Sequence, residues 1–476
     1  MNISQGLPER ARNAVGGLPR EDRILALLLF AWFFITICSY AMLRPVRSAL
    51  ILFSYGPAAL PWMYMATGFV TGVAVYVFSK FAGLPRRRLI GGTLIIFALN
   101  LFLWWWIAVR AGAARAAGAG GWGWTSPAFY VWTDVFSIMA VTVFWMYAAD
   151  VFRTEDAKRV FPIIGAAGPA GGMAGSWLTE ILVRGLGTVN ILLAAAGVYM
   201  LVLFLFFALE RRARGRCARA GAEGVSAGLR PPGLDTSRLA ETIRWIASSR
   251  LLLFLTLLVA LERMVPDFSD FIFQSAGRAA FNEPNAYTRF FAGFEKWCNF
   301  AALGISLFLA APFLRLAGVR AALVSLPATL MVFGSAFIMA PGLGAAVLLK
   351  GAEASQRHSW FKAGKEVIYT TTDRDVIYRI KGYIEMFVYR FSRGLAGLAI
   401  LCIIALGGGP AAVAAASLPL AGVWVWCAWG LGGEYRALER AAADKLTLSA
   451  GNGRAAPANP AGAYKIRRRA GGGNHA

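Results

Sequence analysis

Long apolar runs limit what this chain can fold into more than any other feature of its sequence. The first run, Ile24 to Leu43, follows a polar segment, 1–23, and runs of similar length recur as far as residue 433. About 20 helical residues cross the roughly 30 Å hydrocarbon core of a bilayer, where only helices and closed barrels satisfy every backbone polar group. The runs therefore predict an all-α polytopic membrane protein whose first helix is not a cleaved signal peptide.

The apolar runs group into two halves. We predict about twelve spans, near residues 24–43, 58–79, 89–109, 128–149, 160–183, 185–209, 251–275, 290–311, 321–340, 343–361, 382–408 and 411–433. A basic segment, 210–250, separates the first six-helix half (24–209) from the second (251–433), and its Gly, Ala, Pro and Arg content is typical of a linker. The layout is similar to that of the major-facilitator transporters, which hold substrate near the midplane between their halves. We expect the basic tail, 434–476, to be cytoplasmic and disordered.

The distribution of positive charge predicts the orientation in the membrane. The net charge of +23 could indicate a nucleic-acid partner. However, 36 of the 48 Lys and Arg residues lie in the termini and alternate loops, 7 lie in the intervening loops, including Arg44 and Arg47, and 5 lie within predicted spans. This is the positive-inside pattern, so we expect no nucleic acid, both termini in the cytoplasm, and a multi-pass protein of the bacterial inner membrane. The same pattern supports the tenth span, 343–361, although that span is rich in charge. The ninth span leaves the cytoplasm, and the basic segment 357–381 must lie in the cytoplasm again, so one more crossing is needed between them.

Several protein classes lack support in this sequence. The five cysteines and two histidines show no metal-ligand spacing, and no GxxxxGK(S/T) phosphate loop occurs. We therefore expect no metal, no cofactor and no enzymatic activity, and a chain that acts as a monomer. Any transport would draw on gradients rather than on hydrolysis within this chain.

Charged residues inside the predicted spans need a reason, because each costs roughly 2.5–3.5 kcal/mol on insertion scales. In the seventh span Arg263, Asp267 and Asp270 follow at i, i+4 and i+7, on one helical face. The remaining charges of this kind include Asp134, Glu262, Glu295, Lys296, Lys350, Glu353, Lys381, Glu385, Arg390 and Arg393. They predict either ion pairs between helices or a water-filled cavity for a multiply charged substrate, since Arg and Lys bind phosphate well.

The fifth span carries a stripe of small residues. Its members are Gly165, Gly168, Gly171, Gly172 and Gly175, interrupted by a proline, Pro169. Two small-xxx-small pairs in the stripe favour close packing against another helix. The proline also allows a kink in this helix that could serve a rocking motion.

Three blocks of residues resemble the bacterial and plastid ATP/ADP translocases. The first is YAMLRPVR at 40–47, and the second combines FW at 144–145, DVF at 150–152 and AKRVFPIIG at 157–165. The third combines GKEV at 364–367, KGYIE at 381–385 and Arg390. The resemblance extends from about residue 24 to residue 433. It implies twelve helices and an ATP:ADP antiporter that binds nucleotide.

The resemblance also implies which residues contact the substrate. Charges important in that family correspond to Arg47, Asp134, Asp270 and Lys381, with Arg in place of Lys at 47 and Asp in place of Glu at 134 and 270. Gln274 stands where a Lys is expected, one turn after Asp270, so we expect Asp270 to lack that partner unless Lys296 or Lys350 replaces it. The full set of candidate substrate-binding residues is Arg44, Arg47, Asp134, Asp270, Gln274, Lys350, Lys381, Glu385 and Arg390.

Three functions remain open from the sequence. The chain could exchange nucleotides or other organic phosphates, it could carry another anionic or non-nucleotide solute, or it could be a membrane protein without transport activity. Charges that face a central cavity would favour transport. Charges fully consumed in ion pairs would favour the last alternative.

Overall fold

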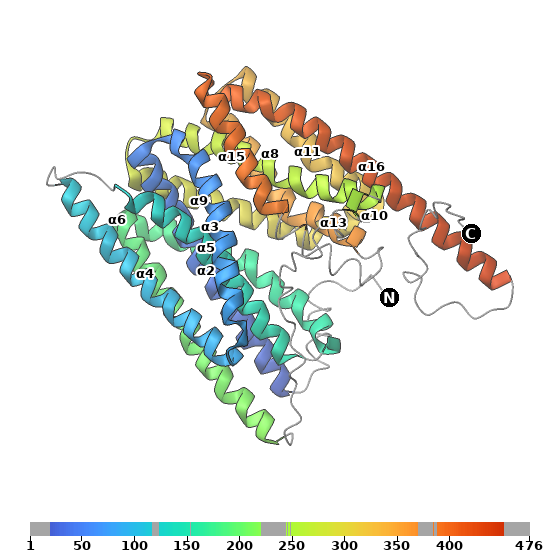
Figure 1. The fold of residues 1–476 in the computed structure, drawn as a ribbon, viewed down its shortest axis with the longest axis horizontal. Coiled ribbons are helices and arrows are strands. Elements are labelled where there is room, and N and C mark those ends of the chain that lie inside the picture. The colour runs from blue at the N-terminus through green and yellow to red at the C-terminus, as the bar shows by residue number, and fades with distance from the viewer. Residues whose placement is uncertain are drawn as a thin grey trace, which may run out of the picture.

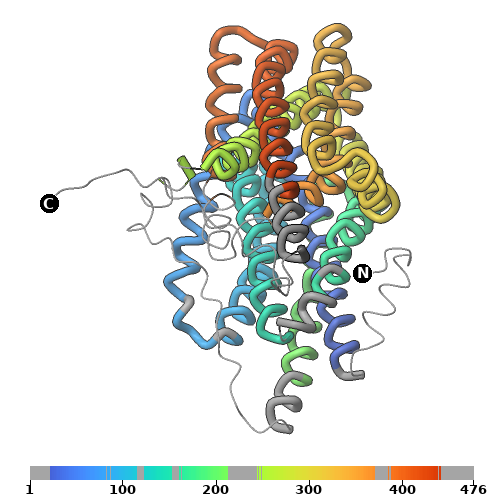
Figure 2. The backbone as a smooth tube through the Cα atoms, turned by 90° about the vertical axis from the view of Figure 1, so that its right-hand side faces the viewer, coloured from blue at the N-terminus to red at the C-terminus, as the bar shows by residue number. Residues whose placement is uncertain are grey.

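A computed structural model of the protein describes residues 20–116, 123–152, 154–219, 244, 246–247, 249–369, 384 and 388–451. The described chain is helical throughout and contains no strand. Figure 1 shows its helices gathered into two bundles, one from each half of the sequence. Figure 2 shows the red and orange helices of the second half above the blue and cyan helices of the first.

Five long helices form the first half. They are α2 (Arg20–Tyr55), α3 (Leu60–Lys80), α4 (Arg86–Ala116), α5 (Thr125–Val151) and α6 (Thr154–Arg219), with short 3-10 turns η1 (Pro57–Ala59) and η2 (Phe81–Gly83) on either side of α3. Their shared core contains a group of aromatic side chains: the Trp32 ring packs against those of Phe144, Tyr147 and Phe206. Burial of large rings of this kind removes much apolar surface from the surroundings and fixes the relative rotation of the helices.

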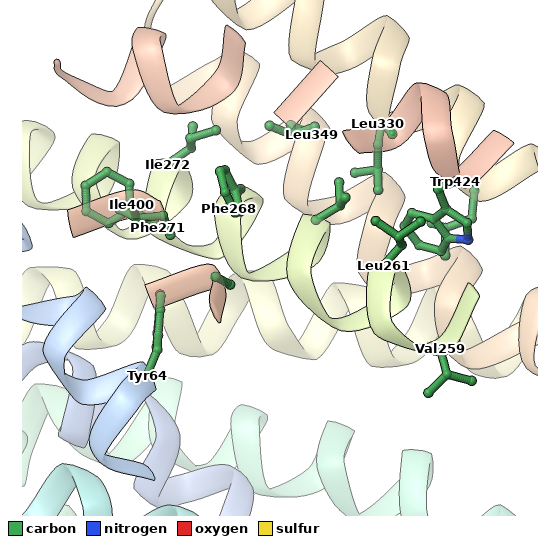
Figure 3. Close-up of a cluster of buried hydrophobic side chains, with 14 of the residues drawn as sticks. Tyr64, Val259, Leu261, Phe268, Phe271, Ile272, Leu330, Leu349, Ile400 and Trp424 are labelled. Carbon is green, nitrogen blue, oxygen red and sulfur yellow. The ribbon is translucent and has the colours of Figure 1, made fainter. Parts of the chain in front are cut away.

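The second half has shorter and more interrupted helices. They are α8 (Arg250–Ala280), α9 (Pro284–Gly304), the π-helix η4 (Ile305–Leu309), α10 (Ala310–Leu316), α11 (Gly318–Met339), α12 (Leu343–Gln356), the π-helix η5 (Arg357–Phe361), α13 (Lys362–Tyr369), α15 (Tyr389–Ala405) and α16 (Pro410–Gly451). Figure 3 shows buried side chains of this half around Phe268 and Trp424, with Tyr64 of α3 among them. The second α-helix of the first half, α3, therefore packs on the second half.

Eight helical segments of the described chain are long and apolar enough to cross a membrane. One of them, Ile163–Arg212, covers most of our predicted spans 160–183 and 185–209, and Gly187, two residues into the second, leaves helical geometry at φ 74°. Helices α8, α12 and α15 are absent from this set; α8 carries four charges in its middle, and α12 and α15 are only 14 and 17 residues long. An all-helical membrane fold is confirmed, whereas the number of twelve spans stays a prediction.

Several predicted boundaries differ from the structure. Among them, α6 continues to Arg219 and so covers the first residues, 210–219, of the predicted linker. We expected Arg44 and Arg47 in a loop after residue 43, but α2 continues through Pro45 to Tyr55, so both arginines lie within the helix. The helix extends because the residues after Pro45 are apolar and buried, and because both guanidinium groups find carboxylate partners. At the other end of the chain, α16 continues to Gly451 and covers residues 434–451, the beginning of the tail for which we predicted disorder.

The small-residue stripe of α6 packs against α2, as the sequence favoured. A Cβ atom on Gly171 would collide with the Phe34 carbonyl oxygen, and one on Gly175 would collide with the Cys38 carbonyl oxygen. The two backbones are therefore close enough that only glycine fits between them. The break in α6 lies at Gly187 rather than at Pro169.

This packing predicts unequal effects of alanine substitutions along the stripe. Gly171→Ala should lower the melting temperature of the purified protein in detergent, because the new methyl group must displace backbone, and overpacking costs about 1–3 kcal/mol. Gly165→Ala is the matched control, since no atom lies within 4 Å of its added Cβ. Equal melting temperatures for the two variants would contradict the close α2–α6 contact.

Candidate functional site

A cavity of about 380 Å³ lies where the two halves meet. We call it the central cavity. Helices α2, α3 and α5 of the first half line it, together with α8, α12, η5 and α15 of the second. The lining residues of the first half are Tyr40, Arg44, Arg47, Thr67, Gly68, Thr71, Asp134, Ser137 and Ile138. Those of the second half are Arg263, Pro266, Asp267, Asp270, Lys350, Arg357, Tyr389, Arg390 and Arg393.

Asp134 links both halves at one wall of the cavity. Its two carboxylate oxygens pair with different guanidinium groups: Arg47 of α2 binds Oδ1, and Arg393 of α15 binds Oδ2 at 2.7 Å. Asp134 is only 4 % exposed and Arg47 only 7 % exposed. Each arginine also lies over a tyrosine ring, Arg47 over Tyr130 at 4.5 Å and Arg393 over Tyr64 at 5.3 Å. Buried charges need this kind of complete pairing, because an unpaired one costs several kcal/mol.

Asp270 is the centre of a second charged group. It accepts hydrogen bonds from the Tyr64 hydroxyl at 2.9 Å and from Gln274 Nε2 at 2.6 Å, and its other oxygen lies 3.3 Å from Lys350 Nζ. Lys350 also pairs with Glu353 at 2.8 Å. The cation that we expected Asp270 to lack is therefore supplied by Lys350, one of the two alternatives considered. Lys296, the other, pairs with Glu180 instead.

Two further ion pairs complete the walls. Arg44 of α2 pairs with Glu295 of α9 at 2.6 Å, across the boundary between the halves. Arg263 pairs with Asp267 one turn later in α8 at 2.9 Å and donates a hydrogen bond to the Tyr389 hydroxyl at 3.2 Å. The expected shared face of Arg263, Asp267 and Asp270 is confirmed, since all three line the central cavity.

Positive charge exceeds negative charge in the described part of the cavity. Its seven cations are Arg44, Arg47, Arg263, Lys350, Arg357, Arg390 and Arg393. Its carboxylates are Asp134, Asp267 and Asp270, and two more, Glu295 and Glu353, pair with its cations from outside the lining. Arg390 donates a hydrogen bond to the Thr71 carbonyl oxygen at 3.3 Å, and no described carboxylate lies within 4.0 Å of it. The cavity therefore suits an anion.

Most candidates from the sequence converge on this cavity. Six of the nine line it: Arg44, Arg47, Asp134, Asp270, Lys350 and Arg390. Gln274 is buried outside the lining and reaches the site through Asp270. Lys381 and Glu385 lie outside the described residues. Five further lining residues were not among our predicted site residues: Arg263, Asp267, Arg357, Tyr389 and Arg393. The first two could have been predicted, because they share a helical face with Asp270.

A polar clasp joins α6 to α9 beside the central cavity. The backbone N–H and the hydroxyl of Thr188 both donate to Asn285 Oδ1 at 2.8 Å, and the same hydroxyl lies 3.0 Å from the Thr288 oxygen. Further along α9, Lys296 Nζ pairs with Glu180 of α6 at 2.7 Å. The contact between the halves here is thus made by polar groups, which can exchange partners more readily than a packed apolar core.

Comparisons with known proteins identify the fold. No protein-family model matches the sequence, and no curated protein matches it. Among solved structures, the chain is similar to the nucleoside transporter NupG, with a TM-score of 0.59 and 14 % identity over 86 % of this chain and 99 % of that one. A D-xylose–proton symporter gives a TM-score of 0.59 and 11 % identity over 85 % and 97 % of the two chains. A bacterial homologue of the iron transporter ferroportin, in an inward-facing state, gives a TM-score of 0.57 and 12 % identity. The match covers 90 % of this chain and 100 % of that one. The chain shares the major-facilitator-like fold of these proteins.

The Asp134 group predicts energetic coupling between the halves. Asp134→Asn and Arg393→Gln should each lower the melting temperature in detergent, because each leaves a buried charge with fewer partners. The double variant should be destabilised by less than the sum of the two single variants, which corresponds to a coupling free energy of about 0.5–3 kcal/mol. Strictly additive losses would show that the two side chains do not interact.

Proposed function

We propose that this protein transports small organic anions across the membrane and binds them in the central cavity. The observation that carries the proposal is the excess of cations lining a cavity walled by both halves. A site at the boundary of two halves can be exposed to either side of a membrane by rocking one half against the other.

The arginine content of the cavity supports an anionic substrate. Six of its lining residues are arginines: Arg44, Arg47, Arg263, Arg357, Arg390 and Arg393. Guanidinium groups bind carboxylate and phosphate in a planar, two-point geometry. The volume of about 380 Å³ lies within the roughly 300–1,000 Å³ typical of small-molecule sites.

The polar contacts between the halves at the central cavity favour exchange of substrates over transport in one direction. Polar links at its walls join the halves, among them Arg44 with Glu295, Asp134 with Arg393, and Tyr64 with Asp270. An anion that binds Arg44 or Arg393 competes with the carboxylate that each arginine now holds, and so weakens a link between the halves. Reorientation would then require a bound anion in each direction, which is the behaviour of an antiporter.

Nucleotides are the substrate class that we propose first. The blocks similar to the ATP/ADP translocases contribute Arg44, Arg47 and Arg390 to the cavity. Tyr40 and Tyr389 also line it and offer aromatic surface to a base. The proposal includes the bacterial inner membrane as the location, with both termini in the cytoplasm and no ATPase in the chain. Another anionic solute is the second candidate, because phosphate and carboxylate groups share the same recognition chemistry.

Counter-exchange in proteoliposomes tests the proposal. Purified protein loaded with unlabelled ADP inside should take up labelled ADP from outside, and Arg390→Gln should weaken exchange roughly tenfold or more, since a charged hydrogen bond is worth about 1.5–3 kcal/mol. Arg184→Gln is the matched control, because that arginine is exposed and lies outside the cavity. Exchange of sugar phosphates or dicarboxylates but not nucleotides would select the second candidate. Equal uptake of uncharged nucleosides would refute anion transport.

Gln274 offers a test of substrate charge. A lysine at this position would lie beside Asp270 and compete with Lys350 for it, which would leave one more cation available to phosphate. Gln274→Lys should therefore improve competition by ATP relative to AMP, while Gln274→Met, which adds no charge, should not. An unchanged order of ATP, ADP and AMP in the lysine variant would remove Gln274 from the selectivity determinants.

A further inference from the structure

A second cavity, of about 570 Å³, lies on the outer side of α9, away from the central cavity. We call it the α9 crevice. Its lining comes from α6, from the connection between α8 and α9, from α9 itself and from α12. The residues are Glu180, Phe281, Ala286, Arg289, Phe290, Gly293, Phe294, Trp297 and Val347.

The α9 crevice opens among side chains that face the bilayer. Trp297 is 63 % exposed, and Trp177, Phe300 and Leu348 nearby along α6, α9 and α12 are also more than half exposed. Helix α9 belongs to the membrane-crossing segment Pro284–Leu316. Large exposed apolar side chains on such a segment contact lipid rather than water, so a ligand reaches this crevice from the membrane.

One end of the crevice is positively charged. Arg289 lies in the second turn of α9, is exposed, and has no described carboxylate within 4.0 Å. Deeper in the membrane, Lys296 is neutralised by Glu180 at 2.7 Å and lies 5.1 Å from the Trp297 ring centroid. The crevice thus has a free cation at its mouth and a compensated ion pair beneath an aromatic surface.

The dimensions of this arrangement match one leaflet. Arg289 and Phe300 are eleven residues apart on α9, which corresponds to about 16 Å at 1.5 Å per residue. Half of the hydrocarbon core is about 15 Å thick. A phosphate at Arg289 would therefore have its acyl chain alongside Phe294, Trp297 and Phe300 as far as the bilayer midplane.

We propose that the α9 crevice binds one phospholipid, with its phosphate against Arg289 and one acyl chain along the aromatic face of α9. The lipid would lie over the Glu180–Lys296 pair, which joins α6 to α9 and hence the two halves. Occupancy would stabilise the arrangement in which this pair is formed. The binding itself is independent of what the central cavity transports.

Native mass spectrometry of the purified full chain tests the site. Titrated with phosphatidylglycerol, the unmodified protein should retain one tightly bound lipid, and Arg289→Gln should weaken that binding roughly tenfold. Diacylglycerol, which has the same chains without the phosphate, should bind the unmodified protein about as weakly as phosphatidylglycerol binds Arg289→Gln. Val347→Trp, which narrows the crevice without changing its charge, should also weaken retention.

Controls separate a specific site from the general lipid shell. Arg184→Gln removes an exposed arginine of α6 that does not line the crevice, and it should retain the lipid like the unmodified protein. Equal losses in the Arg184 and Arg289 variants would overturn the proposal in favour of non-specific association. Full retention by Arg289→Gln would also overturn it, because the phosphate would then have another partner.

Discussion

The need to compensate charge within a membrane protein organises this structure. Asp134, buried in α5, is held by Arg47 from its own half and Arg393 from the other. Removing Asp134 would leave two arginines without this counter-charge, and removing either arginine would leave Asp134 with one partner fewer; a buried charge that loses its pairing costs several kcal/mol. These residues therefore fix how α2, α5 and α15 lie relative to one another, and they fix it across the boundary between the halves. The central cavity forms where such groups meet.

Close backbone packing is the second condition for that cavity. The glycine stripe of α6 lets α2 approach until the carbonyl groups of Phe34 and Cys38 fill the space that a Cβ would need. On the other side, Gly397 of α15 leaves room for the Pro61 carbonyl of α3, which would lie 2.6 Å from an added Cβ. Helices drawn together in this way direct Arg44, Arg47 and Arg393 into one space.

Ion pairing and the substrate binding that we propose would use the same groups in this cavity. We had set paired charges and a charged cavity against each other as alternatives, but the structure contains both, because each described carboxylate of the cavity is paired while cations remain in excess. The carboxylates reduce the cost of clustering these cations, and under the proposed function an anion would compete with them for the arginines.

The sequence by itself determined the helical membrane fold and the packing role of the glycine stripe, and it predicted the two halves and most of the charged residues that line the cavity. These features depend on hydrophobic run length, on local spacing and on the cost of intramembrane charge, which act over one helix or less. Only the tertiary structure decided which charges meet: Asp134 and Arg393 are 259 residues apart, and Lys350 reaches Asp270 from another helix. It also decided that α2 continues past Arg44 and Arg47, because the carboxylates that stabilise those arginines lie in α5 and α9. Partners so distant in the chain are selected by how whole helices pack, and no local pattern encodes that choice.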